Sequence, residues 1–83
     1  MFKGMVDNSV TELEIMFKSL NGSVTVEENI ETKKSLITCR TKEMILDSHK
    51  EKSYLYGALL NCRNYSIKAE NDEIIIVLGF EWR

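Results

Sequence analysis

The longest apolar run in this 83-residue chain lies near its C-terminal end, from Glu73 to Trp82. Its β-branched and aromatic residues are typical of a strand. Side chains in a strand alternate between two faces, so the even positions share one face. We expect that face to form the core, because it carries only large apolar residues: Ile74, Ile76, Leu78, Phe80 and Trp82. The opposite face is apolar only in its middle, at Ile75 and Val77.

Apolar residues spaced three and four apart predict a first helix from about residue 10 to residue 20. Ser9 and Glu12 fit a capping box before it, and Asn21-Gly22 can end it with the glycine in the left-handed conformation. The apolar stripe comprises Val10, Leu13, Phe17 and Leu20, with Met16 beside it. Ile15 points away from this stripe.

A second helix is predicted to follow the capping box formed by Ser48 and Glu51 and to end near residues 61–64. Its stripe is Leu55, Ala58, Leu59 and Cys62. Tyr56 and Leu60 form a pair on the side opposite this stripe.

Alternating and β-branched segments predict strands at 2–6, 24–27, 34–41, 65–69 and 73–82. Residues 29–33 form a polar turn, and Asn71-Asp72 fits a tight hairpin turn because both residues tolerate positive φ. Residues 43–47 fit either a strand or a helix. We expect them to continue the preceding strand after a bend.

The chain repeats parts of its pattern, which predicts a single domain over 1–83 built from two β-α-β-β units, 2–41 and 43–82. Glu28-Asn-Ile-Glu31 in the first unit matches Glu70-Asn-Asp-Glu73 in the second. The predicted class is α+β: a two-layer sandwich of a mostly antiparallel, roughly five-stranded sheet with two helices on one face. The order β-α-β-β-α-β-β is ferredoxin-like with an extra C-terminal strand. Any alternating α+β chain produces some echoes of this kind, so the repeat itself is a hypothesis.

The net charge of −2 conceals acidic ends and a basic middle. If the two Glu-Asn-x-Glu turns lie at the same end of the sheet, they form an acidic rim: Glu27, Glu28, Glu31, Glu70, Asp72 and Glu73. Such a rim is ordinarily solvated, and a hard cation is the sharper alternative. The basic block offers a phosphate track: Lys33, Lys34, Arg40, Lys42, Lys50, Lys52, Arg63 and Lys68.

The sequence lacks a recognisable catalytic constellation, so we expect neither an enzyme nor a cofactor or metal. His49 is the single histidine, and Cys39 and Cys62 are too far apart in sequence for a CxxC motif. A metal-dependent hydrolase built on Asp7 and Asp47 is a remote alternative, because each aspartate ends a predicted strand. We expect a cytoplasmic protein that has no signal peptide, does not contact membranes and keeps both thiols free.

The remaining apolar residues of interest face away from the predicted core. They are Ile75 and Val77 on the closing strand, Tyr56 and Leu60 on the second helix, and Ile15 on the first. These residues predict a small binding protein, an inhibitor or adaptor, that contacts another protein and forms a homodimer through the closing strand or the open sheet face. A virus- or phage-encoded effector acting against a host system belongs to this class. A nucleic-acid-binding module using the basic block of residues 33–68 is the alternative.

Overall fold

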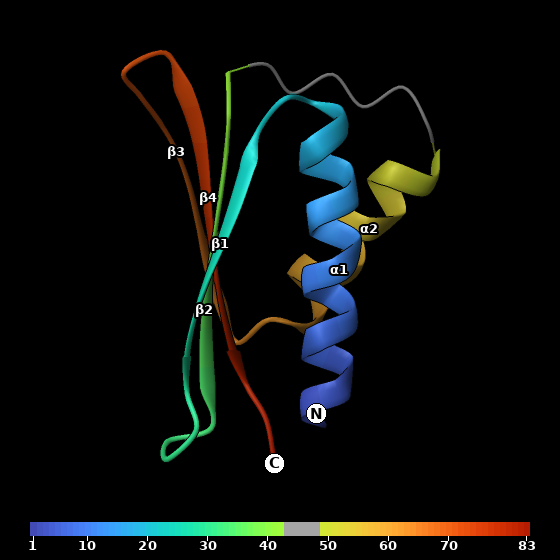
Figure 1. Cartoon of the computed structure of the whole chain (residues 1–83), viewed down its shortest axis with the longest axis vertical. Helices are drawn as coiled ribbons and strands as arrows, with labels where there is room; N and C mark the ends of the chain where they lie inside the picture. The colour runs from blue at the N-terminus through green and yellow to red at the C-terminus, as the bar shows by residue number, and fades with distance from the viewer. Residues whose placement is uncertain (43–48) are drawn as a thin grey trace.

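The chain folds into one antiparallel sheet with two helices on the same side of it. The computed structural model describes residues 1–42 and 49–83, and in the second helix it describes side chains from residue 52 onward. The elements are α1 (Lys3–Ser19), β1 (Ser23–Asn29), β2 (Lys34–Thr41), α2 (His49–Asn61), β3 (Asn64–Glu70) and β4 (Glu73–Glu81). Figure 1 shows both helices in one layer and the four strands in the other. The α+β class, the antiparallel sheet and the one-sided helix layer are therefore as predicted.

The strand count and order differ from the prediction, because residues 2–6 are not a strand. Helix α1 begins at Lys3, and the Ser9 hydroxyl donates a hydrogen bond to the carbonyl of Met5 one turn earlier, so Ser9 is not a cap. The apolar stripe continues back to Val6, which is fully buried. The observed order is α-β-β-α-β-β, with four strands. Residues 43–47 and the second capping box at Ser48 lie outside the described residues.

The closing strand β4 lies in the centre of the sheet, whereas the predicted homodimer through this strand would require it at an edge. The strand order is β1-β2-β4-β3, and all neighbours are antiparallel. Lys34 lies opposite Glu81 at one end of the central β2–β4 pair, and Thr41 lies opposite Ile74 at the other. A homodimer that pairs β4 with a second copy is therefore excluded, because both edges of β4 are already occupied.

The core lies between the sheet and the helices, on the predicted faces. Strand β4 contributes Ile76, Leu78 and Phe80, and Trp82 follows directly after this strand. The other core residues are Val6, Leu13, Met16 and Phe17 of α1, Leu55 and Ala58 of α2, and Ile37 and Cys39 of β2. Ile74, Val10 and Leu59 pack around the margin. The alternation in β4 and the helical stripes thus identified the core correctly.

Glycine is required where α1 turns into β1. Asn21, with φ of 56°, takes the left-handed position that was predicted for Gly22. The amide of Asn21 donates to the carbonyl of Lys18 and the amide of Gly22 to that of Phe17, which is a Schellman motif. A Cβ on Gly22 would collide with the backbone carbonyl of Arg40, so this glycine permits a close approach to β2.

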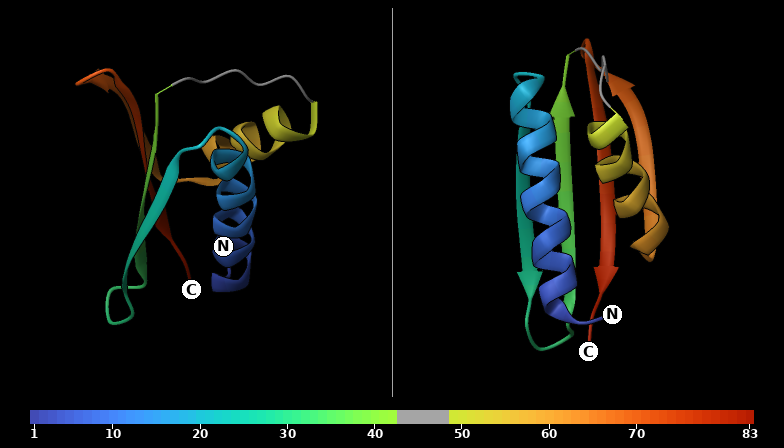
Figure 2. Two further views of the ribbon diagram at one scale, coloured as in Figure 1. Left: turned by 45° about the horizontal axis from the view of Figure 1, so that its top comes forward. Right: turned by 90° about the vertical axis from the view of Figure 1, so that its right-hand side faces the viewer.

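The two chain ends meet at the β1–β2 hairpin end of the sheet (Figures 1 and 2). The amide of Arg83 donates to the carbonyl of Met1 at 2.9 Å, and that of Trp82 to Lys33 at 3.0 Å. The Lys3 ammonium lies 5.9 Å from the centre of the Trp82 ring and forms ion pairs with Asp7 and Glu28. These contacts tie the start of α1 to β1 and to the end of β4.

Candidate functional site: the open face of the sheet

The side of the sheet away from the helices carries no covering layer within the described residues, and we call it the open face. Figure 2 shows the sheet uncovered on this side. Strand alternation and the observed register place these side chains on it: Thr25 and Glu27 of β1; Lys34, Leu36, Thr38 and Arg40 of β2; Ile75, Val77, Gly79 and Glu81 of β4; Asn64, Ser66 and Lys68 of β3.

A short apolar ridge crosses the middle of the open face. Leu36 is 42% exposed, and Val77 is half-buried between Thr38 and Ser66. Ile75 faces the same side, as predicted, but only 4% of its surface is exposed. Its cross-strand neighbours are Arg40 and Lys68, whose long aliphatic stems can cover it. Ile75 is therefore not the accessible contact that the sequence suggested, and Leu36, which sequence analysis overlooked, is more exposed.

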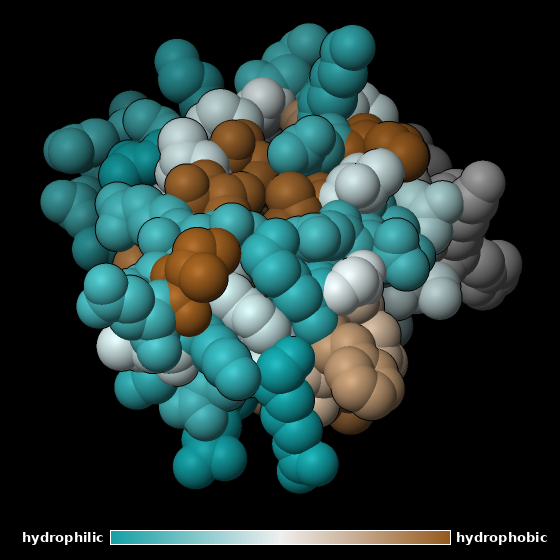
Figure 3. Space-filling view, turned by 60° about the horizontal axis from the view of Figure 1, so that its bottom comes forward, coloured by the Kyte–Doolittle hydropathy of each residue, from teal (hydrophilic) through white to brown (hydrophobic). Residues whose placement is uncertain are grey.

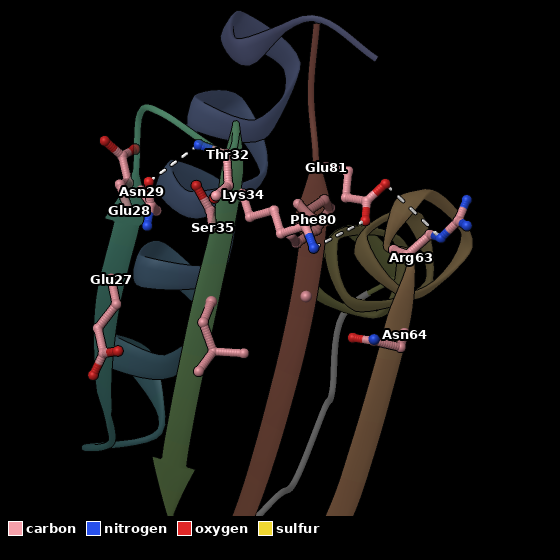
Figure 4. Close-up of a pocket in the computed structure, with 12 residues that line it drawn as sticks. Glu27, Glu28, Asn29, Thr32, Lys34, Ser35, Arg63, Asn64, Phe80 and Glu81 are labelled. Carbon is pink, nitrogen blue, oxygen red and sulfur yellow. Dashed lines mark hydrogen bonds and ion pairs between the residues drawn. The ribbon is translucent and has the colours of Figure 1, made fainter.

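The first of two hollows on this face lies beside Gly79, towards the β1–β2 hairpin, and has a volume of about 500 Å³. Gly79 sits between Leu36 and Asn64, and the Asn64 side chain occupies the space that a Cβ on Gly79 would need. Figure 4 shows Lys34 and Arg63 both directed towards Glu81. The closest distances are 3.7 Å from Lys34 Nζ and 4.0 Å from Arg63 Nε to the carboxylate.

At the margin of the first hollow lies Ser35, whose side chain belongs to the inner face. Its hydroxyl is buried and has no hydrogen-bond partner among the described residues. A buried hydroxyl without a partner costs free energy, about 1–3 kcal/mol. The hydroxyl alone does not identify a ligand.

The second hollow, of about 370 Å³, lies at the other end of the open face. Arg40 and Lys68 line it on either side of Ile75, and Glu70 and Glu73 close its end. Lys68 pairs with Glu70 at 3.1 Å. Arg40 has no ion pair with any carboxylate of the described residues.

The predicted acidic rim does not form. The β1–β2 hairpin and the β3–β4 hairpin lie at opposite ends of the molecule in Figure 1, because their second strands, β2 and β4, run antiparallel. Glu27, Glu28 and Glu31 are thus separated from Glu70, Asp72 and Glu73. Glu28 is also held by Lys3 at 3.3 Å. The described residues contain no cluster of three or more potential metal-binding side chains.

The predicted basic block is likewise dispersed. Lys33 lies in the β1–β2 turn and Lys42 beyond the opposite end of β2, roughly 25–30 Å away at the rise of an extended strand. Lys34, Arg63 and Lys68 are each within ion-pair distance of a glutamate. Arg40 stands on the open face and Lys52 on α2. The side chain of Lys50 lies outside the described residues. The described members of this block therefore do not form a continuous phosphate track.

The other predicted contact residues lie in the helix layer, apart from the open face. Ile15, Tyr56 and Leu60 are exposed as expected, and Leu60 is 85% exposed. Two apolar residues of the predicted strand at 65–69, Tyr65 and Ile67, are also exposed. Figure 3 shows apolar side chains reaching the surface in several areas separated by polar ones.

Burial and ion pairing determine the surroundings of the two thiols and of Asp7. Burial raises the pKa of the Cys39 thiol to about 12, and burial also raises the pKa of Cys62, whereas a nucleophilic cysteine needs a lowered pKa. Asp7 lies within α1 and pairs with Lys3 at 3.2 Å, so it does not follow a strand as the hydrolase hypothesis required. Hydrogen bonds from Lys3 to Asp7 and Glu28 raise the pKa of the lysine. The side chain of His49 and all of Asp47 lie outside the described residues.

No protein-family model, curated protein or solved structure shows a significant match to the chain. Neither helix in the described part of the chain has the length and apolar character needed to cross a membrane.

Proposed function

We propose that the protein is a non-catalytic binding module that holds a segment of another protein on its open face. The observation that carries this proposal is the ridge of exposed Leu36 and half-buried Val77 between two hollows, on a sheet side that no described element covers. Contiguous apolar surface of this kind, rimmed by polar residues, is typical of interaction sites. Because hollows flank the ridge, a partner's apolar side chains can enter beside Leu36 and add to the area buried.

The charges around the ridge favour a partner segment that combines an apolar side chain with a carboxylate. Arg40 is the cation on this face that lacks an ion pair within the described residues. A guanidinium binds a carboxylate through two parallel hydrogen bonds, which adds specificity as well as affinity. Lys34 and Lys68 contribute less, because each already faces a glutamate.

An inhibitor or adaptor works through a surface of this kind, including a virus- or phage-encoded effector against a host system. Such a protein needs one stable face and no reaction chemistry. This matches a site built from backbone register and ordinary side chains, with no activated nucleophile among them.

The test begins with affinity capture from a nuclease-treated lysate, followed by calorimetry with the purified partner. The Leu36→Lys variant should lower affinity at least tenfold, about 1.4 kcal/mol, and Glu27 opposite Leu36 should accommodate the new lysine. Ile15→Lys is the control and should bind normally, because it changes an apolar residue of the helix layer that is 55% exposed and lies apart from the open face. Arg40→Gln should weaken binding and reduce its salt dependence.

Two outcomes would contradict the proposal. Partner binding that is unchanged by Leu36→Lys but lost in Ile15→Lys would move the site to the helices. Capture that disappears after nuclease treatment would favour the nucleic-acid alternative.

A further inference from the structure

The edge strand β3 is the least covered element in the sheet. All seven of its residues are exposed, including Tyr65 at 59% and Ile67 at 55%, whose side chains point towards the helix layer. Helix α2 packs mainly against α1 and β4 and hardly touches β3. Figure 1 and the left view of Figure 2 show why: α2 is inclined away from the sheet, and only its C-terminal end approaches the strands.

The other edge strand, β1, is also exposed at six of its seven residues, but it is better covered than β3: Val26 is 37% exposed against 55% for Ile67. Helix α1 packs against both β1 and β2, and Lys3 fixes Glu28 of β1 at 3.3 Å. Val24 and Val26 occupy the positions in β1 that Tyr65 and Ile67 occupy in β3, and Val24 packs against the core. An uncovered edge with free backbone groups and apolar side chains is a template for another strand.

We infer that β3 pairs antiparallel with β3 of a second copy of this chain, about a two-fold axis at Ile67. The register follows from side-chain parity, because residues directly opposite each other in an antiparallel pair share a face. With Ile67 on the axis, Tyr65 faces Ala69 of the copy, Ser66 faces Lys68 and Asn64 faces Glu70, so all seven residues of the strand are paired.

This register is complementary in size and charge. The small Ala69 leaves room for the ring of Tyr65 from the other copy, and two Ile67 side chains meet at the centre. No like charges stand directly opposite each other, whereas a register centred on Lys68 would oppose two lysines. Lysines on an edge strand generally discourage pairing with another strand. The ammonium of Lys68, however, is 3.1 Å from the carboxylate of Glu70 in the same strand, so its charge is already paired.

Pairing in this way creates one eight-stranded sheet and leaves both open faces accessible. Tyr65 and Ile67 of the two copies would form a small apolar cluster beneath the two α2 helices. The dimer therefore does not compete with the proposed partner. It presents two copies of the open face on one continuous surface, which would increase the avidity for a partner with repeated segments.

Sedimentation velocity on the purified chain over a range of concentrations tests the dimer without any partner. Wild type should shift from monomer to dimer as concentration rises. Ile67→Lys should weaken self-association at least tenfold, about 1.4 kcal/mol, because it places two lysines opposite each other on the axis. Val26→Lys, at the matching position of β1, should associate like wild type.

Cross-linking tests the register and decides the case if Ile67→Lys does not fold. In a Cys62→Ser background, Ile67→Cys should form a disulfide-linked dimer on mild oxidation, because opposite residues in an antiparallel pair are about 4.5–5.5 Å apart at Cα. Val26→Cys should stay monomeric.

A wild type that remains monomeric up to high micromolar concentration would overturn the inference. So would association that resists Ile67→Lys and fails in Val26→Lys, or cross-linking at residue 26 instead of 67. None of these outcomes bears on partner binding at the open face, which is measured separately.

Discussion

The two α-β-β units of this protein have the same element order but differ in how well the helix covers its strands. Helix α1, with 17 residues, packs against both β1 and β2, whereas α2, with 13 residues, packs against β4 and leaves β3 exposed. Four side chains of α1 are fully buried, while the buried side chains described in α2 are Leu55 and the small Ala58. Helix α1 therefore covers its own two strands more fully than α2 does, although each unit contributes six of the described residues to the buried core. The second unit has the more exposed edge strand.

The largest expected difference between the units is in the stability lost when a helix residue is replaced by alanine. Phe17→Ala should cost about 3–5 kcal/mol, because Phe17 is fully buried and its removal leaves a cavity. Leu60→Ala in α2 should change stability by less than about 0.5 kcal/mol, since Leu60 is almost fully solvated. Urea denaturation followed by circular dichroism measures both. A cost of several kcal/mol for Leu60→Ala would mean that α2 buries a different face.

The junction at Gly22 gives the next largest effect. Gly22→Ala forces a Cβ against the backbone carbonyl of Arg40, which cannot move without disturbing β2. Overpacking of this kind typically costs about 1–3 kcal/mol. The loss should appear in the urea midpoint of the purified variant. A variant as stable as wild type would show that the α1–β1 turn shifts freely and that the first unit is less tightly joined than its contacts indicate.

Sequence periodicity identified the faces of the elements because it reports which residues must leave water. The even face of β4, the stripes of both helices and the strand at residues 34–41 were all correct. The hairpin turn was also correct, since Asn71 and Asp72 have φ values of 53° and 63°. These features are local, and each follows from side-chain spacing or from backbone preferences.

Features that depend on how distant elements meet could not be obtained this way. The exposure of Ile67 depends on the inclination of α2, and the cover of Ile75 depends on Arg40 and Lys68 from the neighbouring strands. The acidic rim failed because the direction of β2 relative to β4 decides where the hairpins lie. The error at residues 2–6 was local: Ser9 was interpreted as a cap although the apolar stripe extended beyond it.

Each unit contains one cysteine, and the pH dependence of stability reports how deeply the thiol of the first unit is buried. Cys39 of β2 has a pKa of about 12 because it is buried, so the folded state keeps its proton at pH values where the unfolded chain releases it. The buried Cys39 thiol makes its full contribution to stability below a pH of about 8.5, the pKa of a cysteine in the unfolded chain. This contribution declines by about 1.4 kcal/mol per pH unit as the pH rises towards 12. Comparing wild type with Cys39→Val by urea titration between pH 8 and 10 isolates this slope.

The same comparison predicts which thiol reacts first. Cys62, at the end of α2, is only partly buried, so a thiol reagent should label it well before Cys39 in the native protein. Labelling of Cys39 at the same rate would indicate that the first unit opens as readily as the second. Equal pH slopes for wild type and Cys39→Val would contradict the burial of this thiol.

The smallest expected effect is a gain in stability from a substitution in α2, the helix that covers its strands less well. Gly57 lies inside α2, and a Cβ built there meets no atom within 4 Å, so alanine fits without displacement. Gly57→Ala should stabilise the protein by about 0.5–1 kcal/mol, because glycine loses more backbone entropy than alanine in a helix. The urea midpoint measures this gain. Because the substitution strengthens α2 without covering β3, self-association through β3 should stay unchanged. A gain in stability together with loss of the dimer would instead show that the exposed edge depends on an incompletely formed α2.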